Sequence, residues 1–367
     1  MISIENLLLD EVVSEQKEDE EEYNFIEKMP WVEKYRPQKI DDIMYQHEVK
    51  EMLKDTLKSN NLPHLLFYGP PGTGKTSTIL AIAKELFGPN IYRERVVELN
   101  ASDERGINIV RNKIGRLAKT AIGSPDPDYP SPPYRIIILD EADAMTTEAQ
   151  SALRKTMEDY SSITRFCFIC NYINQIIEPI ASRCVKFRFK QLDEESMYIK
   201  LKNISENENI NIDDICIRKL IEISEGDMRK SITFLQNLAY VLVLKDSITC
   251  EDIYEMSNYI PDRYIEAIDK YCIQSKNEDI YNAVSLAKKI RRNGYPVNNL
   301  IKRLQNHIVD HDDVLEKHKA LICLKLSNIE RKLNMGSDEY IQILNILMYI
   351  KGVVLERITQ HSPICLL

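Results

Sequence analysis

The chain has 367 residues, 44% of them hydrophobic, and a formal net charge of −9. This length predicts two or three domains with sizeable cores. Membrane and secreted classes are disfavoured, because no run of about 18 apolar residues occurs and residues 1–10 lack the basic and apolar parts of a secretory signal. We therefore expect a soluble, intracellular protein with no membrane partner.

Residues 1–28 carry most of the negative charge. They contain ten acidic residues and two lysines, a net of −8 out of the total of −9. Such a composition predicts a disordered acidic tail. The remaining body is then close to neutral and can still gather basic side chains on one face, so the overall charge does not exclude a nucleic-acid partner.

Residues 31–37 read as an extended segment that ends at Pro37. A segment placed before a nucleotide-binding domain can pack against the base of the nucleotide, and Val32 and Arg36 are candidates for such a pocket. From spacing alone, an N-terminal arm that packs without any ligand is the favoured interpretation.

Residues 69–76 match the phosphate-binding loop, with two glycines four residues apart followed by Lys and Thr. The apolar run 64–68 predicts a buried strand before the loop, and the spacing of 76–87 predicts a helix after it. Lys75 would reach the β- and γ-phosphates, and Thr76 would place its hydroxyl on Mg²⁺. The loop consists of Gly69, Pro70, Pro71, Gly72, Thr73, Gly74, Lys75 and Thr76.

A second strand over 96–99 is followed by a helix that begins near Ser102 or Asp103 and runs to about Thr120. Its basic residues, spaced three and five apart, share a broad face rather than one stripe. On charge alone, an ordinary solvated face is the favoured interpretation. These residues are Arg111, Lys113, Arg116 and Lys119.

The buried strand 135–139 ends in Asp140 and Glu141, at the sheet edge where parallel α/β proteins bind ligands. Asp140 would hold Mg²⁺ directly or through water, and Glu141 would act as general base on the attacking water. A helix over 146–157 and a strand over 166–169 follow, and Asn171 at the tip of that strand would bridge the γ-phosphate and the water. The pair Cys167 and Cys170 lies inside the apolar run 165–170, and no second cysteine pair follows at zinc-binding spacing.

A fifth strand, 185–189, completes the pattern of a doubly wound parallel α/β sheet of the P-loop type. From residue 192 to about 257 the periodicity is helical, and Gly226 and Asp227 open a new helix. Arg229 then lies in the first turn, where the helix dipole disfavours a cation, so an anionic ligand is the natural explanation. Residues 262–358 are also helical and show no catalytic motif.

Taken together, these motifs resemble the AAA+ ATPases and, within them, the small subunits of the replication factor C clamp loader. The resemblance runs from about Pro30 to Glu356. It implies an AAA+ ATPase domain over 29–190, a helical lid over 191–258, a helical collar over 262–358 and a tail over 359–367. The motifs that carry it are Val32-Glu-Lys-Tyr-Arg-Pro37, Leu99-Asn-Ala-Ser-Asp-Glu-Arg-Gly106, Ala152-Leu-Arg-Lys-Thr-Met-Glu158, Ile177-Glu-Pro and Ser182-Arg-Cys184.

The resemblance also implies roles for single residues. Arg183 would be an arginine finger that reaches the ATP of a neighbouring subunit, Asn171 would be sensor one and Arg229 sensor two. Val32 and Arg36 would contact adenine. The implied DNA contacts are Arg105, Arg111 and Arg116, on the segment that would follow the duplex backbone without reading its sequence.

The implied activity is ATP hydrolysis with Mg²⁺, used in the nucleus to load the sliding clamp PCNA on primer-template DNA during replication and repair. The implied partners are the other replication factor C subunits, in a heteropentamer. The sequence departs from the family at Gly115, where a lysine is common, and at Lys155, where an arginine is usual. Lysine keeps the positive charge at position 155 but lacks the planar guanidinium group of arginine.

Two other functions stay open at this point. A structural subunit would bind ATP without useful hydrolysis, although Thr76, Asp140 and Glu141 are all intact. A different AAA+ machine, such as an origin-binding initiator or a branch-migration helicase, usually adds a winged-helix domain at its C-terminus. The helical periodicity after Pro261 contains no hairpin signal, which weakens that alternative.

Overall fold

The computed structural model describes residues 29–43, 51, 53, 62–102, 114–119, 123–242, 245, 248–275 and 280–356. The chain divides into two compact units, unit 1 up to residue 243 and unit 2 from residue 244. The acidic tail predicted over 1–28 and the tail over 359–367 lie outside the described residues. The domain limits predicted from the sequence are finer than this division and stay predictions.

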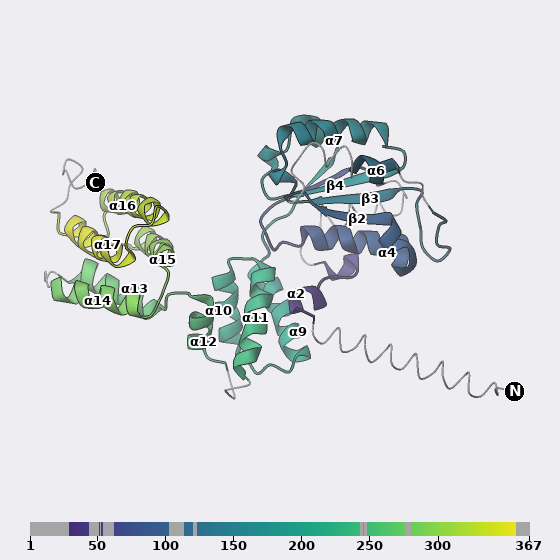
Figure 1. The fold of residues 1–367 in the computed structure, drawn as a ribbon. Helices are drawn as coiled ribbons and strands as arrows, with labels where there is room; N and C mark the ends of the chain where they lie inside the picture. The colour runs from purple at the N-terminus through teal and green to yellow at the C-terminus, as the bar shows by residue number, and fades with distance from the viewer. Residues whose placement is uncertain are drawn as a thin grey trace. The chain divides into compact units, whose positions relative to one another are not determined.

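Unit 1 is built on a parallel sheet in the order β2-β3-β4-β1-β5 (Figure 1). The strands predicted from the apolar runs are all present, which confirms the doubly wound α/β fold of the P-loop type. The order places the ends of β3, β4 and β1 side by side, and Tyr68 at the end of β1 pairs with Cys170 at the end of β4. The strands are β1 Leu65–Tyr68, β2 Val96–Asn100, β3 Arg135–Asp140, β4 Thr164–Cys170 and β5 Val185–Arg188.

Helices cover both faces of the sheet because successive strand residues point to opposite sides. Phe67 and Ile136 pack with α4, whereas Leu66 and Ile137 pack with α7 on the other face (Figure 1). The helices and short 3-10 turns are η1 Ile40–Asp42, α4 Lys75–Arg95, α6 Gly115–Lys119, η3 Ala142–Ala144, α7 Thr147–Asp159, η4 Ile173–Gln175 and α8 Glu178–Ala181.

Two local features differ from the sequence-based expectation. The helix after the phosphate-binding loop does break at Gly88, which has φ +65 and ψ 175, but the chain resumes helical geometry and α4 continues to Arg95. Residues 31–34 form the short helix α2, not an extended segment. Tertiary contacts favour this turn, since the Trp31 amide donates to Gln236 Oε1 at 3.1 Å and Lys34 pairs with Glu208 at 2.6 Å.

The helical part of unit 1 contains α9 Glu194–Asn207, α10 Asp214–Ser224 and α11 Met228–Leu242. Helix α2 (Trp31–Lys34) lies beside α11, although about two hundred residues separate them (Figure 1). Asp227 accepts a hydrogen bond from the Lys230 amide at 3.1 Å and so caps α11, as the sequence predicts.

Unit 2 is helical throughout its described residues, apart from turns and connections, and its helices after Ile260 pack around one apolar core. Residues 335–338 separate its last two helices, and Asp338 caps the second by accepting from the Ile341 amide at 2.9 Å. No described helix in either unit is both long and apolar enough to cross a membrane. The helices are α12 Cys250–Ser257, α13 Asp262–Asp269, the π-helix η5 Lys270–Gln274, α14 Ile280–Arg292, α15 Val297–Asp310, α16 Glu316–Asn334 and α17 Glu339–Val354.

Candidate active site

The phosphate-binding loop joins β1 to α4, and glycine is required within it. Gly69 has φ +148, and a Cβ there would lie 2.2 Å from the Phe189 carbonyl oxygen. Gly74 has φ +88 and stands directly before the first turn of α4. The loop therefore turns tightly onto the helix N-terminus, where free backbone amides and the helix dipole attract phosphate.

Lys75 is the cation at the centre of this loop. Its residue is only 8% exposed, and Nζ donates to the Gly69 and Pro70 carbonyl oxygens at 2.7 Å each and to Asn171 Oδ1 at 3.0 Å. Burial lowers the pKa of Lys75, and the carboxylate of Asp140 opposes that shift. An anionic ligand would favour the protonated lysine in the same way, so the surroundings of Lys75 suit a phosphate group.

Thr76 and Asp140 form the next pair. The Thr76 hydroxyl donates to Asp140 Oδ2 at 2.8 Å, while Asp140 Oδ1 accepts from the Glu141 amide at 2.8 Å. A hydroxyl and a carboxylate oxygen in direct contact are ligands of the type that Mg²⁺ prefers. Their meeting follows from the sheet order, which brings the end of β3 beside the start of α4.

Glu141 and Asn171 extend from the same edge of the sheet. Glu141 is exposed and has φ +53, an unfavourable conformation for glutamate that points to a functional constraint. Asp143 Oδ2 accepts hydrogen bonds from the amides of Asn171 and Tyr172, at 3.1 and 3.2 Å. This carboxylate fixes the tip of β4, so that the Asn171 side chain reaches Lys75.

A single cavity in unit 1 is lined by predicted residues from four parts of the sequence. They come from the N-terminal segment, the phosphate-binding loop, the ends of β3 and β4, and the start of α11. These residues are Val32, Arg36, Pro71, Gly72, Thr73, Gly74, Lys75, Thr76, Asp140, Glu141, Asn171 and Arg229.

The cavity also has lining residues that the sequence analysis missed. Tyr35 and Met228 stand beside predicted residues in the chain, and that proximity is the signal that was available. Lys200 on α9 gave no signal, because it looks like an ordinary lysine on a solvated helix face. The other missed residues are Pro37, Asp42, Ile43, Ser77, Ile169, Leu192 and Ile232.

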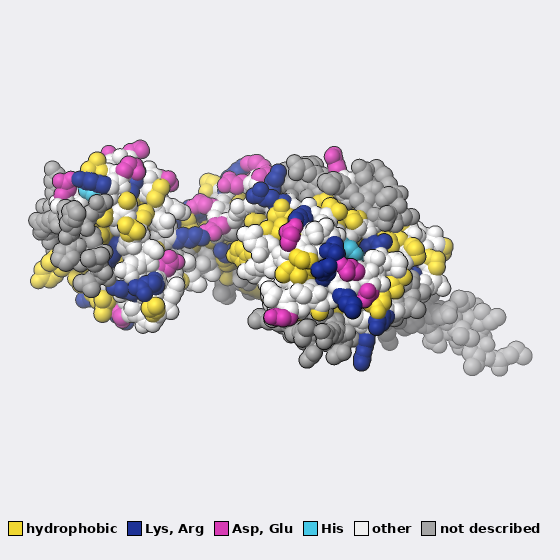
Figure 2. Space-filling view, turned by 90° about the horizontal axis from the view of Figure 1, so that it is seen from above, with side chains coloured by type: hydrophobic (Ala, Val, Ile, Leu, Met, Phe, Trp, Pro, Cys, Tyr) yellow, Lys and Arg dark blue, Asp and Glu magenta, His cyan; other side chains and the backbone are white. Residues whose placement is uncertain are grey.

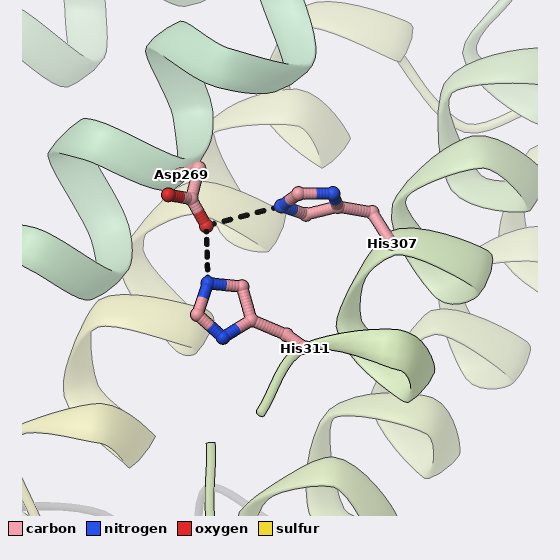
Figure 3. Close-up of side chains that lie close together, drawn as sticks. All are labelled: Asp269, His307 and His311. Atoms are coloured by element: carbon pink, nitrogen blue, oxygen red, sulfur yellow. Dashed lines mark hydrogen bonds and ion pairs between the residues drawn. The ribbon is translucent and has the colours of Figure 1, made fainter. Parts of the chain in front are cut away.

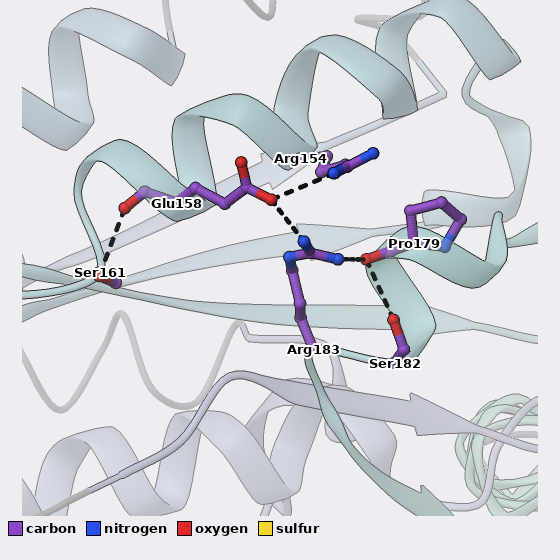
Figure 4. A network of polar contacts seen from close by, with 6 residues as sticks. All are labelled: Arg154, Glu158, Ser161, Pro179, Ser182 and Arg183. Atoms are coloured by element: carbon purple, nitrogen blue, oxygen red, sulfur yellow. Dashed lines mark hydrogen bonds and ion pairs between the residues drawn. The ribbon is translucent and has the colours of Figure 1, made fainter.

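Arg183 does not line this cavity. It is exposed in the short segment between α8 and β5, where Nη1 donates to the Pro179 carbonyl oxygen at 2.7 Å and Nη2 pairs with Glu158 (Figure 4). Glu158 also accepts from Arg154 at 3.2 Å, and its pKa is lowered first by that hydrogen bond and then by the charge of Arg183. The guanidinium therefore lies on an outer surface of the chain, away from the chain's own phosphate-binding loop.

The predicted DNA contacts are described only in part. Arg116 is exposed on α6, whereas Arg105 and Arg111 lie outside the described residues. A shallow groove between α6 and α7 is lined by Gly115, Lys119 and Lys155 among others. Figure 2 views the α7 side of unit 1, where Lys and Arg side chains are interspersed with Asp and Glu. Charge on this face alone does not identify a nucleic-acid surface.

Comparison with known proteins adds family information to this geometry. The chain matches the model of the ATPase family associated with various cellular activities over residues 65–192, the replication factor C C-terminal domain over 260–349, the RCF1/5-like AAA+ ATPase lid domain over 200–240 and the Rad17 P-loop domain over 23–106. It is 49% identical to replication factor C subunit 2 of Oryza sativa, over 86% of this chain and 92% of the relative. The chain belongs to the replication factor C subunits.

Further relatives agree with that assignment. Replication factor C subunit 4 of Arabidopsis thaliana is 47% identical over 86% of this chain and 93% of the relative, and human subunit 4 is 45% identical over 91% and 90%. The motifs Phe87-Gly-Pro and Cys170-Asn-Tyr172 predict a particular likeness to subunit four. The likeness is confirmed, and subunit 2 relatives are similar to the same degree, at 45–49% identity. The chain is therefore a nucleotide-binding ATPase of the clamp-loader type and a member of a multi-subunit replication factor C complex.

Solved structures support the fold. The RuvB Holliday junction branch migration motor of Thermotoga maritima aligns with a TM-score of 0.50 at 17% identity, over 70% of this chain and 85% of that one. At this identity the likeness shows the AAA+ fold and does not favour a branch-migration activity.

Gly72 provides a test of the site geometry. It has φ +69, and a Cβ there would lie 1.8 Å from Asp227 Oδ1 and 3.0 Å from Asp227 Cα. Gly72→Ala would force the loop away from the start of α11, and we expect nucleotide affinity to fall about tenfold or more, since left-handed strain alone costs on the order of 1 kcal/mol. Titration with a fluorescent ATP analogue measures the effect.

The matched control for this variant is Gly294→Ala. Gly294 has φ +73 but no atom within 4 Å of the added Cβ, and it lies in unit 2. It should leave nucleotide affinity unchanged. Equal affinities of Gly72→Ala and the parent chain would contradict the described contact between the loop and α11.

Proposed function

We propose that this subunit hydrolyses ATP with Mg²⁺ at a site shared with a neighbouring subunit of a heteropentamer, and that the complex loads PCNA on primer-template DNA in the nucleus during replication and repair. One observation carries the shared-site proposal. The residues needed to bind and activate a nucleotide line one cavity of unit 1, whereas Arg183 lies outside that lining.

The chain's own residues supply the nucleotide side of the site. Lys75 and the loop amides hold the phosphates, and Thr76 and Asp140 hold Mg²⁺, which supplies charge neutralisation to the phosphates when bound. Glu141 accepts the proton of the attacking water, and Asn171 holds that water in line. Support comes from the direct contacts of Lys75 with Asn171 and of Thr76 with Asp140.

Adenine and the γ-phosphate are assigned to residues from opposite ends of unit 1. Val32 and Arg36 contact the base, beside the apolar side chains of Ile43 and Ile232 in the same cavity. Arg229 follows Met228, the first residue of α11, as a cation at the positive end of the helix dipole. A phosphate in the cavity relieves that repulsion, which supports the role of Arg229 as the sensor that couples nucleotide to the lid.

Arg183 completes the site of the adjacent subunit. Its pairing with Glu158 is solvent-exposed, and exposed ion pairs contribute little stability, so the guanidinium can be released to a phosphate of a partner. An arginine supplied in trans stabilises charge that develops on the transferred phosphoryl group.

Arg183→Ala tests the shared site. In the assembled complex, we expect this chain's own ATP affinity to stay unchanged while turnover at the adjacent site falls by about 10³-fold or more, the scale of an arginine finger. Single-turnover hydrolysis with the other sites inactivated measures the effect. Arg218→Ala, which removes an exposed arginine that pairs with Glu195 at 3.0 Å, is the control and should be silent. A loss of this chain's own ATP affinity in Arg183→Ala would instead assign the arginine to this chain's own site and contradict the shared site.

DNA contact is assigned to the segment that carries Arg105, Arg111 and Arg116. Of these residues, Arg116 belongs to α6, which contributes Gly115 and Lys119 to the groove that Lys155 also lines. These side chains would contact phosphates and position the duplex without reading sequence. The complex would thus bind primer-template junctions through many such contacts.

Arg111→Ala tests the DNA assignment. Binding of primed DNA by the assembled complex should weaken, and the slope of log affinity against log salt should decrease by about 0.9, the value for one phosphate contact. Arg218→Ala again serves as control, since it also removes one positive charge. An unchanged salt slope in Arg111→Ala would remove this residue from the contact surface.

A further inference from the structure

Three side chains of unit 2 with metal-ligating atoms converge outside the nucleotide cavity. Asp269 is the last residue of α13, His307 lies in the last turn of α15, and His311 caps the end of α15 (Figure 3). Their ligating atoms all lie within 4.8 Å of one another. The described part of the chain shows no other group of this kind.

The distances are close to those of a tetrahedral metal site. Asp269 Oδ1 lies 3.0 Å from His307 Nε2 and 3.1 Å from His311 Nε2. Ligands at the zinc bond lengths of about 2.0–2.1 Å stand roughly 3.3 Å apart around a tetrahedral ion. Two of the three ligand-to-ligand distances are therefore close to that spacing, and the ligand atoms of the two histidines lie within 4.8 Å of each other.

We propose that Asp269, His307 and His311 form a Zn²⁺ site, with water as the fourth ligand. Two imidazoles and one carboxylate are the N/O ligands that suit zinc, and three protein ligands leave one position open. The inference concerns unit 2 alone and does not depend on the proposed ATP chemistry.

The surroundings of Asp269 support this assignment. The residue is 7% exposed, and its second oxygen, Oδ2, accepts from Gln274 Nε2 at 2.6 Å. Such a partner orients the carboxylate and leaves Oδ1 directed at the two histidines. Gln274 belongs to the π-helix η5, a rare geometry that is frequent at functional sites. His307 and His311 are partly exposed, so an ion has a path to the site.

The hydrogen bonds of His311 define what zinc must displace. The Asp313 amide donates to His311 Nδ1 at 3.2 Å, so in the metal-free chain Nε2 carries the proton and donates to Asp269. A neutral ring that binds zinc through Nε2 carries its proton on Nδ1. Metal binding would therefore release the Asp313 amide from His311.

The ion would link parts of the unit that are distant in sequence. Asp269 and His307 are 38 positions apart, and the hydrogen bond between them joins the end of α13 to α15. A bound zinc would replace this contact with two stronger metal-ligand bonds. Because an ion that binds only the folded state stabilises it by mass action, zinc should raise the melting temperature of unit 2.

The test is a Co²⁺ titration of the full chain, free of nucleotide and treated beforehand with a chelator, followed by displacement with Zn²⁺. We expect one equivalent to bind, with visible absorption bands of four-coordinate cobalt and no thiolate charge-transfer band. Each ligand is then removed in turn, in His307→Gln, His311→Gln and Asp269→Asn. Each variant should bind Zn²⁺ at least about tenfold more weakly, because loss of a residue that only supports a metal ligand already costs about that much.

His318→Gln is the matched control, because His318 lies in the same unit but outside the cluster. It should leave the cobalt spectrum and the Zn²⁺ affinity unchanged. Circular dichroism confirms that each variant is folded, and the titration of the parent chain needs no variant at all. Any of three results would overturn the site: no saturable binding, the appearance of a thiolate band, or the same Zn²⁺ affinity in all folded variants. The three residues would then form only a hydrogen-bonded His-Asp network.

Discussion

A protonated lysine buried at the edge of a sheet requires negative charge around it, and Lys75 imposes this requirement on unit 1. In the described structure two loop carbonyls and the Asn171 amide oxygen surround its ammonium group. These acceptors carry partial charge only, and burial still lowers the pKa of Lys75. A phosphate chain would satisfy the ammonium group more fully, so the same constraint that shapes the loop also selects the ligand.

The sheet order turns that constraint into an active site. Because β3, β4 and β1 are neighbours, Asp140, Asn171 and Lys75 meet at one edge, and Asp143 holds the tip of β4 in place. Arg183 follows α8 on another surface, where Glu158 binds it. Under the proposed function, a chain built in this way binds nucleotide with its own residues and receives the last positive charge from a neighbour. The proposed function would then couple ATP hydrolysis to assembly of the complex.

The sequence predicted the sheet and the candidate site well, because both depend on short-range patterns. Apolar runs marked the five strands, and the motif at 69–76 and the acids after 139 pointed to residues that line one cavity. The helix dipole argument placed Arg229 near an anion, and Arg229 does line the cavity. Features that depend on distant contacts were missed. Helix α2 forms against Gln236 and Glu208, Lys200 reaches the cavity from α9, and Asp269 meets a pair of histidines far along the chain. The spacing of residues within a short segment does not indicate such long-range contacts.

The measurement that tests the shared active site most directly is steady-state ATP turnover by this chain alone and within the assembled complex, each with and without PCNA and primed DNA. We expect negligible turnover by the chain alone and a rise when the partners, clamp and DNA are added. Within the complex, Glu141→Gln should remove this subunit's share, because the general base is lost. Unchanged turnover in Glu141→Gln would instead identify a structural subunit, and strong DNA-dependent turnover by the chain alone would contradict a site completed in trans.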